Sequence, residues 1–178
     1  MSLDPTVTLR ALAHPLRLRI LSLLTGTPMT AAEVARELNL THANASYHLR
    51  HLLAAREIEI ESEERIRGGV AKRYRTTPPF KLDSSQDEPH DLRPTPGHLL
   101  FYEAIAAELR RRSHALQRAK AHVTDAELWV APEVYDKVVD LINAASQALH
   151  EAAVAPRTPG TIRASATIAV FRMDPDAR

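Results

Sequence analysis

Apolar residues recur at helical spacing in the first part of the chain and predict a helix from Val7 to Leu24. They fall on one face, at Leu9, Leu12, Leu16, Ile20 and Leu23/Leu24. Pro15 lies inside this pattern, and a proline removes a backbone donor and clashes with the preceding turn. We therefore expect a kink, or a break into two helices, near Ala13.

Two further helices are predicted on either side of a tight turn. Thr30 can cap the first, because Glu33, three residues later, completes a capping box. Thr41 stands at the N-cap of the second, which covers residues 41–56 and follows a turn at residues 39–40. The buried stripe of this second helix comprises Ala45, Leu49, Leu52 and Leu53. The side chains left facing outward include His42, Asn44, Tyr47 and His51.

After this helix the pattern changes from helical to alternating, which is typical of a half-buried strand. Ile58 and Ile60 face one way, and the acidic residues between and around them face the other. Gly68 and Gly69 tolerate the positive φ angles of a tight hairpin turn. A return strand over residues 71–76 then carries cationic side chains on its exposed side. The pattern predicts a two-stranded hairpin directly after the helix pair.

The second half of the chain predicts a mixture of long helices and short strands. Residues 83–96 are polar and rich in proline, which indicates a linker. A long helix is expected from Gly97 to Val123, and an amphipathic helix from Pro132 to about Ala153. A short strand at residues 128–130 and an alternating strand at residues 161–171 are expected to pair with each other.

Composition narrows the functional classes. Aromatic residues make up only 4% of the 178 residues, which favours helix packing over a large sheet. The chain has no cysteine, which excludes disulfides, thiolate metal sites and cysteine nucleophiles. We find no basic-then-apolar leader and no apolar run long enough to cross a membrane, so a cytoplasmic protein without a membrane partner is expected.

The charge is distributed unevenly along the chain. Residues 1–82 contain 12 Lys and Arg against 8 Asp and Glu, a balance of +4, whereas residues 83–178 contain 11 against 14, a balance of −3. Residues 65–81 are basic without a single acid. A local cationic ridge of this kind is the footprint of nucleic-acid contact, so the first half is the candidate DNA-binding half.

Helix, tight turn, helix and a hairpin with a cationic tip form the winged helix-turn-helix arrangement. A helix of this kind fits the major groove, where exposed polar side chains meet base edges. The segments that carry a family resemblance are ALAHPLRLRILSLL, MTAAEVARELNL, THANASYHLRHL and RGGVAKRYRTT. In this order and spacing, over roughly residues 7–77, they resemble the ArsR-type winged helix-turn-helix repressors.

The resemblance implies a set of DNA-binding residues. On or beside the DNA-facing side of the recognition helix, they are Thr41, His42, Asn44, Ser46, Tyr47 and Arg50. In the wing, over residues 58–76, they are Arg67, Lys72 and Arg73, where contacts go to phosphate or to the minor groove. The histidine at His48 is expected to be partly buried against the first helix rather than to read a base.

Two features depart from the family pattern. Arg56 stands where a glycine commonly ends the recognition helix, and a left-handed cap at a non-glycine residue would cost about 1 kcal/mol. The first wing strand is also strongly acidic, with Glu57, Glu59, Glu61, Glu63 and Glu64. We expect these carboxylates to point away from DNA or to contact another part of the protein.

The sequence offers little for metal binding or catalysis. His98, His114, His122, Asp125 and Glu127 are the candidates for a metal site, but their spacing does not match the family's histidine and carboxylate motif. There is no nucleophile elbow, phosphate-binding glycine loop or zinc-protease motif. No cofactor and no catalytic residue is therefore expected.

Dimerisation is expected through the long helix after the linker. The candidate interface residues are Phe101, Ile105, Leu109 and Leu116. The alternative is that they pack only on the chain's own terminal helix. Four aromatic side chains are either ordinary core or the lining of a small apolar pocket for an unidentified small-molecule effector: Phe101, Tyr102, Trp129 and Tyr135.

Taken together, the sequence predicts a mostly α fold with small β. Residues 1–82 form a winged helix-turn-helix domain, 83–96 a linker, and 97–178 a helical dimerisation and effector region that contains a short strand pair. The expected function is that of a homodimeric repressor that binds double-stranded DNA in a sequence-specific manner. Three alternatives stay open: a winged-helix module that binds protein, a metal sensor that uses histidine and carboxylate ligands, and a hydrolase or other enzyme built around histidines.

Overall fold

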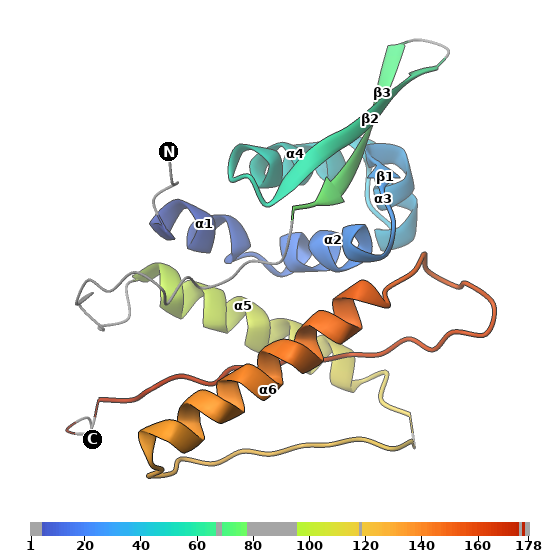
Figure 1. Cartoon of the computed structure of the whole chain (residues 1–178). Helices are drawn as coiled ribbons and strands as arrows, with labels where there is room; N and C mark the ends of the chain where they lie inside the picture. The colour runs from blue at the N-terminus through green and yellow to red at the C-terminus, as the bar shows by residue number, and fades with distance from the viewer. Residues whose placement is uncertain (1–4, 67–68, 78–95, 118, 175, 177–178) are drawn as a thin grey trace.

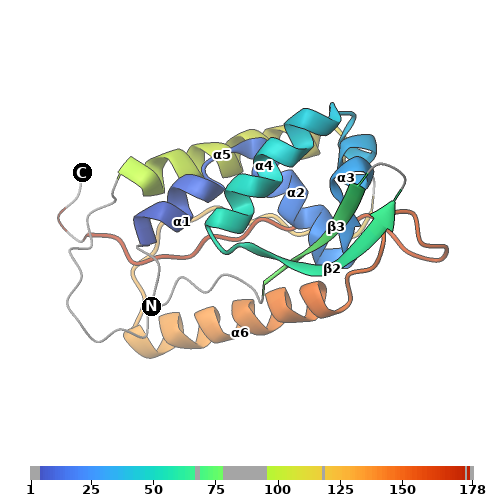
Figure 2. The same ribbon diagram turned by 90° about the horizontal axis from the view of Figure 1, so that it is seen from above.

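The computed structural model describes residues 5–66, 69–77, 96–117, 119–174 and 176. These residues form six helices and one three-stranded antiparallel sheet with the strand order β1-β3-β2. The sheet and the helices next to it lie above α1 and α2, with the two C-terminal helices below (Figure 1). Viewed from above, α6 lies along the opposite edge of the molecule from α5 (Figure 2). The mostly α fold with a small β wing is confirmed.

The first helical pattern is broken into two helices at the proline, as expected. Helix α1 spans Pro5–Leu12 and α2 spans Pro15–Gly26. His14 lies between them in an extended conformation, and its Nδ1 accepts a hydrogen bond from the backbone N–H of Leu16 at 3.1 Å. Proline at the first position of α2 has no N–H to leave unsatisfied, so the break costs α2 little.

The helix pair follows the predicted caps closely. Strand β1, Met29–Thr30, leads into α3, Ala31–Leu38, where Thr30 and Glu33 form both hydrogen bonds of the capping box. Asn39 ends α3 in the left-handed conformation with φ 55°, which asparagine tolerates better than most residues. Helix α4 then spans His42–Ala54 and is capped by Thr41.

The wing consists of β2, Ile58–Ile66, and β3, Gly69–Thr76. Strand β3 lies in the middle of the sheet, so Tyr74 pairs with Ile60 on one side and with Met29 on the other. The hairpin tip at residues 67 and 68 lies outside the described residues. The predicted change from helical to alternating period therefore marks a real change of element.

The end of α4 has a non-glycine residue in the left-handed conformation. Arg56 has φ 59°, its N–H donates to the Leu53 carbonyl, and the N–H of Glu57 donates to the Leu52 carbonyl, each at 3.0 Å. This pair of hydrogen bonds is the Schellman arrangement, which usually has glycine at the left-handed position. The chain adopts it with an arginine at the left-handed position, and β2 begins two residues later.

The core lies between the helix pair, α2 and the sheet. Its side chains are apolar and less than 9% exposed: Ile20, Leu24, Met29, Val34, Ala35, Ala45, Leu49, Leu52 and Ile58. The predicted buried stripe of α4 supplies Ala45, Leu49 and Leu52 to this core. The opposite face of α4 is therefore held rigidly toward the outside.

Helix α5 spans Pro96–Ser113 and packs against α1 and α2. The expected long helix thus ends ten residues before Val123, which corrects the sequence prediction. Beyond Ser113 the chain makes only two short turns, in which Ala115 and Leu116 donate to the carbonyls of Arg112 and Ser113. Leu116 and Val123 are 78% and 91% exposed, so no buried surface supports a continued helix here.

Helix α6 spans Pro132–Glu151, as the sequence predicts, but the strand pair around it is not formed. Residues 128–130 and 161–171 are extended, and neither segment belongs to a strand in the described part of the chain. Most of the predicted linker, residues 83–95, lies outside the described residues.

The segment that follows α6 touches the first half of the chain at two points. A Cβ at Gly26, the last residue of α2, would lie 2.3 Å from the carbonyl oxygen of Val154, so only glycine allows this approach. Arg157 donates to both carboxylate oxygens of Glu37 on α3 at 2.8 Å. The C-terminal half is therefore in contact with the helix pair as well as with α1 and α2.

Candidate nucleic-acid interface

The outward face of α4 carries the polar residues that the sequence assigned to DNA. Thr41, His42, Asn44, Tyr47 and Arg50 are all exposed, and Ser46 is half-buried. The buried stripe runs along the opposite side, so the helix separates its two faces cleanly. The face can meet base edges because nothing in the described part of the chain covers it.

The N-terminus of α4 is capped by its own side chain. Thr41 Oγ1 accepts a hydrogen bond from the backbone N–H of Asn44 at 3.2 Å. The partial positive charge at a helix N-terminus favours a nearby anion. His42 and Asn44 lie in this first turn. The N-terminal end of α4 therefore carries polar side chains and also attracts phosphate.

Along the same face, two side chains are held in place by their neighbours. The ring of Tyr47 lies edge-on to His51, with 4.5 Å between ring centroids. Arg50 Nε is 3.4 Å from the carbonyl oxygen of Ser46, a long hydrogen bond that leaves the rest of the guanidinium in solvent. Arg50 therefore keeps free donors for a bidentate contact with a base.

His48 is structural, as expected. Its side chain is 5% exposed, and its ring lies 4.7 Å from that of His14 and 5.1 Å from that of Tyr47. Burial lowers its pKa to about 4, with smaller contributions from the charges of His14, Arg17 and His51. Its Nδ1 is buried and has no hydrogen-bond partner among the described residues. The neutral ring fastens α4 to the start of α2.

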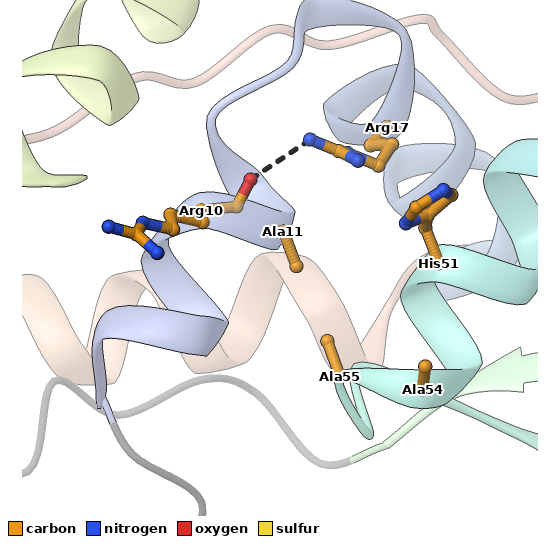
Figure 3. A pocket seen from close by; sticks show the side chains of 6 residues that line it. All are labelled: Arg10, Ala11, Arg17, His51, Ala54 and Ala55. Atoms are coloured by element: carbon orange, nitrogen blue, oxygen red, sulfur yellow. Dashed lines mark hydrogen bonds between the residues drawn. The ribbon is translucent and has the colours of Figure 1, made fainter.

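A basic pocket that sequence reasoning missed lies beside the C-terminal end of α4. It is an open hollow of about 330 Å³. Figure 3 shows the side chains that line it, which come from α1, α2 and the end of α4. Its lining residues are Arg10, Ala11, Arg17, His51, Ala54 and Ala55, with no carboxylate. Arg17 donates to the Arg10 carbonyl at 2.9 Å, burial lowers the pKa of Arg17, and its Nε has no partner among the described residues. Since three separate helices contribute, no single motif predicts this pocket.

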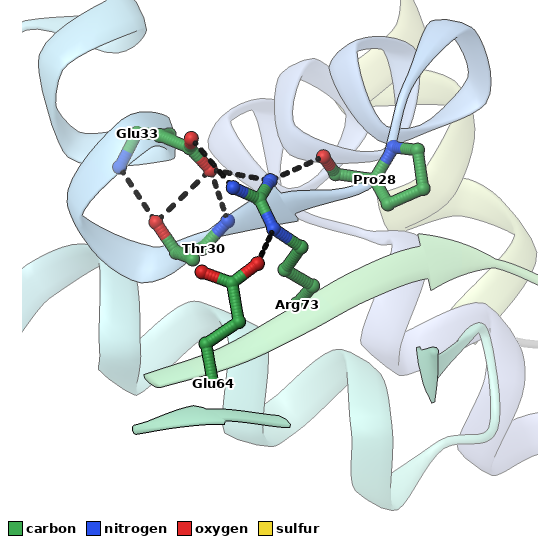
Figure 4. A network of polar contacts seen from close by, with 5 residues as sticks. All are labelled: Pro28, Thr30, Glu33, Glu64 and Arg73. Atoms are coloured by element: carbon green, nitrogen blue, oxygen red, sulfur yellow. Dashed lines mark hydrogen bonds and ion pairs between the residues drawn. The ribbon is translucent and has the colours of Figure 1, made fainter. Parts of the chain in front are cut away.

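Most of the wing cations are paired with acids of the protein itself. Arg73 donates to Glu64 at 2.6 Å, to Glu33 at 3.1 and 3.2 Å, and to the Pro28 carbonyl at 3.2 Å (Figure 4). Glu33 is the residue that also completes the capping box of α3. Arg73 therefore ties the wing to the helix pair.

The same pairing extends along the rest of the hairpin. Lys72 lies 3.5 Å from Glu63, and Arg75 forms an ion pair with Glu59 across the two strands. The expectation that the acidic strand contacts another part of the protein is thus met by β3. Lys72 remains 45% exposed and can still reach outward, whereas Arg67 lies outside the described residues.

The candidate dimer residues of α5 are not brought together as one exposed stripe. Phe101 and Ile105 are half-buried and Leu109 is half-exposed, while Leu116 lies beyond the end of the helix. The face of α5 that is buried instead comprises Gly97, Ala104 and Glu108. Trp129 is 87% exposed, so it belongs neither to the core nor to an apolar pocket.

The described residues contain no cluster of three or more histidine, aspartate or glutamate side chains that could hold a metal ion. Among the same residues, no helix is long and apolar enough to cross a membrane. The five candidate metal ligands, His98, His114, His122, Asp125 and Glu127, are therefore not assembled into a site by the described chain.

Comparison with known families gives a match in the first half of the chain. Residues 12–56 match the model of a helix-turn-helix domain, which covers α2, α3 and α4. No curated protein matches the chain. The match supports a DNA-binding regulator, and it coincides with the part of the chain that presents the polar face of α4.

Proposed function

We propose that the chain is a dimeric, sequence-specific DNA-binding transcriptional repressor of the ArsR type. In this proposal α4 enters the major groove, and the wing over residues 58–76 lies on the backbone or in the minor groove. The observation that carries it is the division of α4 into a buried apolar stripe and an uncovered polar face that starts at a capped N-terminus. Because of that division, a DNA duplex can reach the side chains of His42, Asn44 and Arg50.

The basic pocket supports the same orientation. Arg10 and Arg17 place two cations next to the recognition helix, and no acid lines the pocket. A buried guanidinium nitrogen without a partner is costly, and a phosphate oxygen is the acceptor that DNA would supply. We assign this pocket to the DNA backbone, where contacts position the helix but do not read sequence.

The first experiment is selection of bound duplexes from a random pool, using the full chain. A palindromic sequence with half-sites about one helical turn apart, roughly 34 Å, is expected for a two-fold dimer. A pool that is not enriched at low salt would contradict the proposal.

Arg50 should carry sequence discrimination. Replacing Arg50 with Ala should weaken binding to the selected duplex by about 1 to 3 kcal/mol, because a bidentate contact with a base is lost. Replacing Lys72 or Arg10 with Ala should instead weaken binding to all sequences alike, since phosphate contacts carry no sequence information. Fluorescence anisotropy with selected and scrambled duplexes measures both effects.

The matched control is Arg110→Ala, which removes the same charge from an exposed position on α5. It should leave binding to both duplexes unchanged. If Arg50→Ala behaves like this control, α4 does not read DNA through this face.

The second candidate function is a winged helix that binds protein, and the ion-paired wing is the observation that favours it. Three acids of β2 neutralise three cations of β3: Glu59, Glu63 and Glu64 face Arg75, Lys72 and Arg73. A DNA-binding chain should lose affinity for DNA steeply as salt rises, because counterions are released from the duplex. A binding signal for DNA that is weak and insensitive to salt would favour the protein-binding module.

A further inference from the structure

Two extended segments flank α6 and have strand-like sequences, yet neither forms a strand. Residues 119–131 precede the helix and residues 161–174 follow it, and Figure 1 shows both as coil. In the described structure, residues 119–130 and 162–174 make no backbone–backbone hydrogen bond. Every residue in these runs brings one donor and one acceptor, so each segment is an open edge for strand pairing.

The apolar side chains of the same region are also uncovered. Leu128, Ile162 and Ile168 are 75%, 90% and 51% exposed. Helix α6 has no buried residue over its 20 residues, although its sequence is amphipathic. An isolated helix of this length is marginal in water, because helices in proteins are stabilised chiefly by packing an apolar face. The region therefore has the apolar side chains that a core requires, but in this structure they are exposed.

The total surface makes the same point for the whole molecule. A compact monomer of 19.8 kDa would expose about 8,600 Å². This chain exposes 14,282 Å², a total that includes the residues outside the described ranges. An obligate dimer interface buries about 2,000 to 5,000 Å² summed over both partners, or about 1,000 to 2,500 Å² on each chain, so the excess is more than enough to supply one.

We propose that a second copy of this chain covers the C-terminal half by exchanging strands. Residues 119–131 of each copy pair as a β-strand with residues 161–174 of the other, and the apolar faces of the two α6 helices close over the resulting sheet. A two-fold axis produces this pairing twice, so both open edges of both copies are used. The proposal deepens the dimer of the proposed function, on which it rests, by naming what joins the two copies.

Charge favours this particular pairing. Asp125 and Glu127 lie two residues apart, on one face of the first segment if it is a strand, and Arg163 lies in the second. All three are exposed, and none forms an ion pair within the described part of the chain. Opposite charges facing each other across a strand pair are stabilising and like charges are not. Pairing the first segment with the second, in a register that sets Arg163 opposite Asp125 or Glu127, brings these charges together. Pairing either segment with its own copy does not.

The second segment is already held next to α5 of its own chain. Arg112 donates to the Ser165 hydroxyl and to the Ala166 carbonyl, both at 3.3 Å, and Phe171 lies 5.8 Å from Tyr102 between ring centroids. Because α5 packs against α1 and α2, strand exchange would link the two DNA-binding halves through α5. The dimer then has a fixed spacing between its recognition helices.

The first test is the mass of the full chain in solution, by sedimentation equilibrium at about 10 μM. The wild-type chain is expected to be a dimer at this concentration. Burial of an apolar surface as large as a protein core gives a dissociation constant well below about 10 μM. The double variant Ile162→Asp with Ile168→Asp should be monomeric, and the matched control Thr167→Asp, in the same segment but with the opposite alternation, should remain a dimer. A wild-type monomer would overturn the proposal.

A charge swap tests whether the segments pair between copies and guards against variants that merely fail to fold. Arg163→Glu alone, and Asp125→Lys with Glu127→Lys alone, should each weaken the homodimer by about tenfold or more, because like charges then face each other. Mixing the two variants should restore dimerisation as a heterodimer, in which both strand pairs again join opposite charges. Pairing within one chain cannot be rescued by mixing, so a mixture that stays as weak as its components would contradict strand exchange.

The outcomes for the dimer and for DNA binding are separable. If the mixture is rescued but the wild-type chain selects no duplex, strand exchange stands and the proposed function fails. If the wild-type chain binds a selected duplex but sediments as a monomer, the proposed function stands in part and strand exchange fails.

Discussion

The imidazole of His48 couples the recognition helix to pH. It lies against His14 at the start of α2, with Arg17 and His51 as the other charged neighbours, and burial is the main cause of its pKa of about 4. The unfolded chain has the ordinary histidine pKa of about 6.5, so it takes up the proton first as the pH falls. The stability contributed by neutral His48 is therefore complete above about pH 6.5 and is lost between there and pH 4, by about 3 kcal/mol in total.

We expect His48→Gln to flatten this pH dependence. Between pH 7 and pH 5 the wild-type free energy of unfolding should fall by about 2 kcal/mol through His48, and the variant should lack this part of the loss. Denaturant titrations of both proteins at the two pH values measure the difference.

The matched control is His42→Gln, on the exposed face of the same helix. It should lose stability with pH as the wild type does, because His48 is unchanged. Equal pH dependence in His48→Gln and His42→Gln would show that another group titrates.

Arg56 is a second residue whose backbone conformation matters more than its type. At φ 59° a side chain is strained, and glycine is not. The free energy of unfolding of Arg56→Gly should exceed that of Arg56→Ala, which removes the same side chain and keeps the Cβ, by about 1 kcal/mol. Chemical denaturation of the three proteins decides this, and a gain shared by both variants would assign it to the arginine side chain instead.

At the scale of elements, one side chain links the wing to two other elements through hydrogen bonds. Arg73 joins Glu64 of β2 to Glu33 of α3 and also bonds the carbonyl before β1, while Lys72 makes a single ion pair at 3.5 Å. The wing should therefore depend on Arg73 for its position far more than on Lys72.

We expect Arg73→Ala to lower the free energy of unfolding by about 1 to 2 kcal/mol, because the carboxylates of Glu33 and Glu64 lose their shared partner. Lys72→Ala, the neighbouring cation on the same strand, should change it by less than about 0.5 kcal/mol, as is usual for exposed pairs. Thermal unfolding of the two variants gives the comparison. Equal losses would mean that the hydrogen bonds of Arg73 contribute no more than one exposed ion pair.

Local signals in the sequence were enough to predict the helices and the hairpin of the first half, but not the two-residue strand β1. The break at Pro15 and the capping box of Thr30 and Glu33 both depend on residues within one turn of each other. The polar face of α4 followed from the same helical period as its buried stripe. The basic pocket did not, because Arg10, Arg17 and His51 meet only after three helices have packed.

The predictions that the structure corrects are those that depended on distant partners. The apolar period of residues 97–123 does not distinguish a continuous helix from one that ends at Ser113, because Leu116 and Val123 need a surface to pack on. The strand pair failed for the same reason: alternation predicts an extended backbone, but not which edge it meets. Within the described residues of one chain, that edge is missing.

At the scale of the whole molecule, the two halves differ in how well their apolar side chains are buried. The first half encloses its own core around Ile20, Leu49 and Leu52, whereas α6 in the second half buries none of its residues. A chain of this kind is expected to unfold in a concentration-dependent way, because the second half gains its packing only on association.

The contact between Gly26 and Val154 has a consequence for genetics. A methyl group added at Gly26 would meet the Val154 backbone at 2.3 Å and displace the segment that leaves α6, although position 26 lies at the far end of α2 from the basic pocket. A screen for lost regulation should therefore recover substitutions here that leave every DNA-contacting side chain intact. Such alleles would report on how the halves of the molecule are joined rather than on what its recognition helix reads.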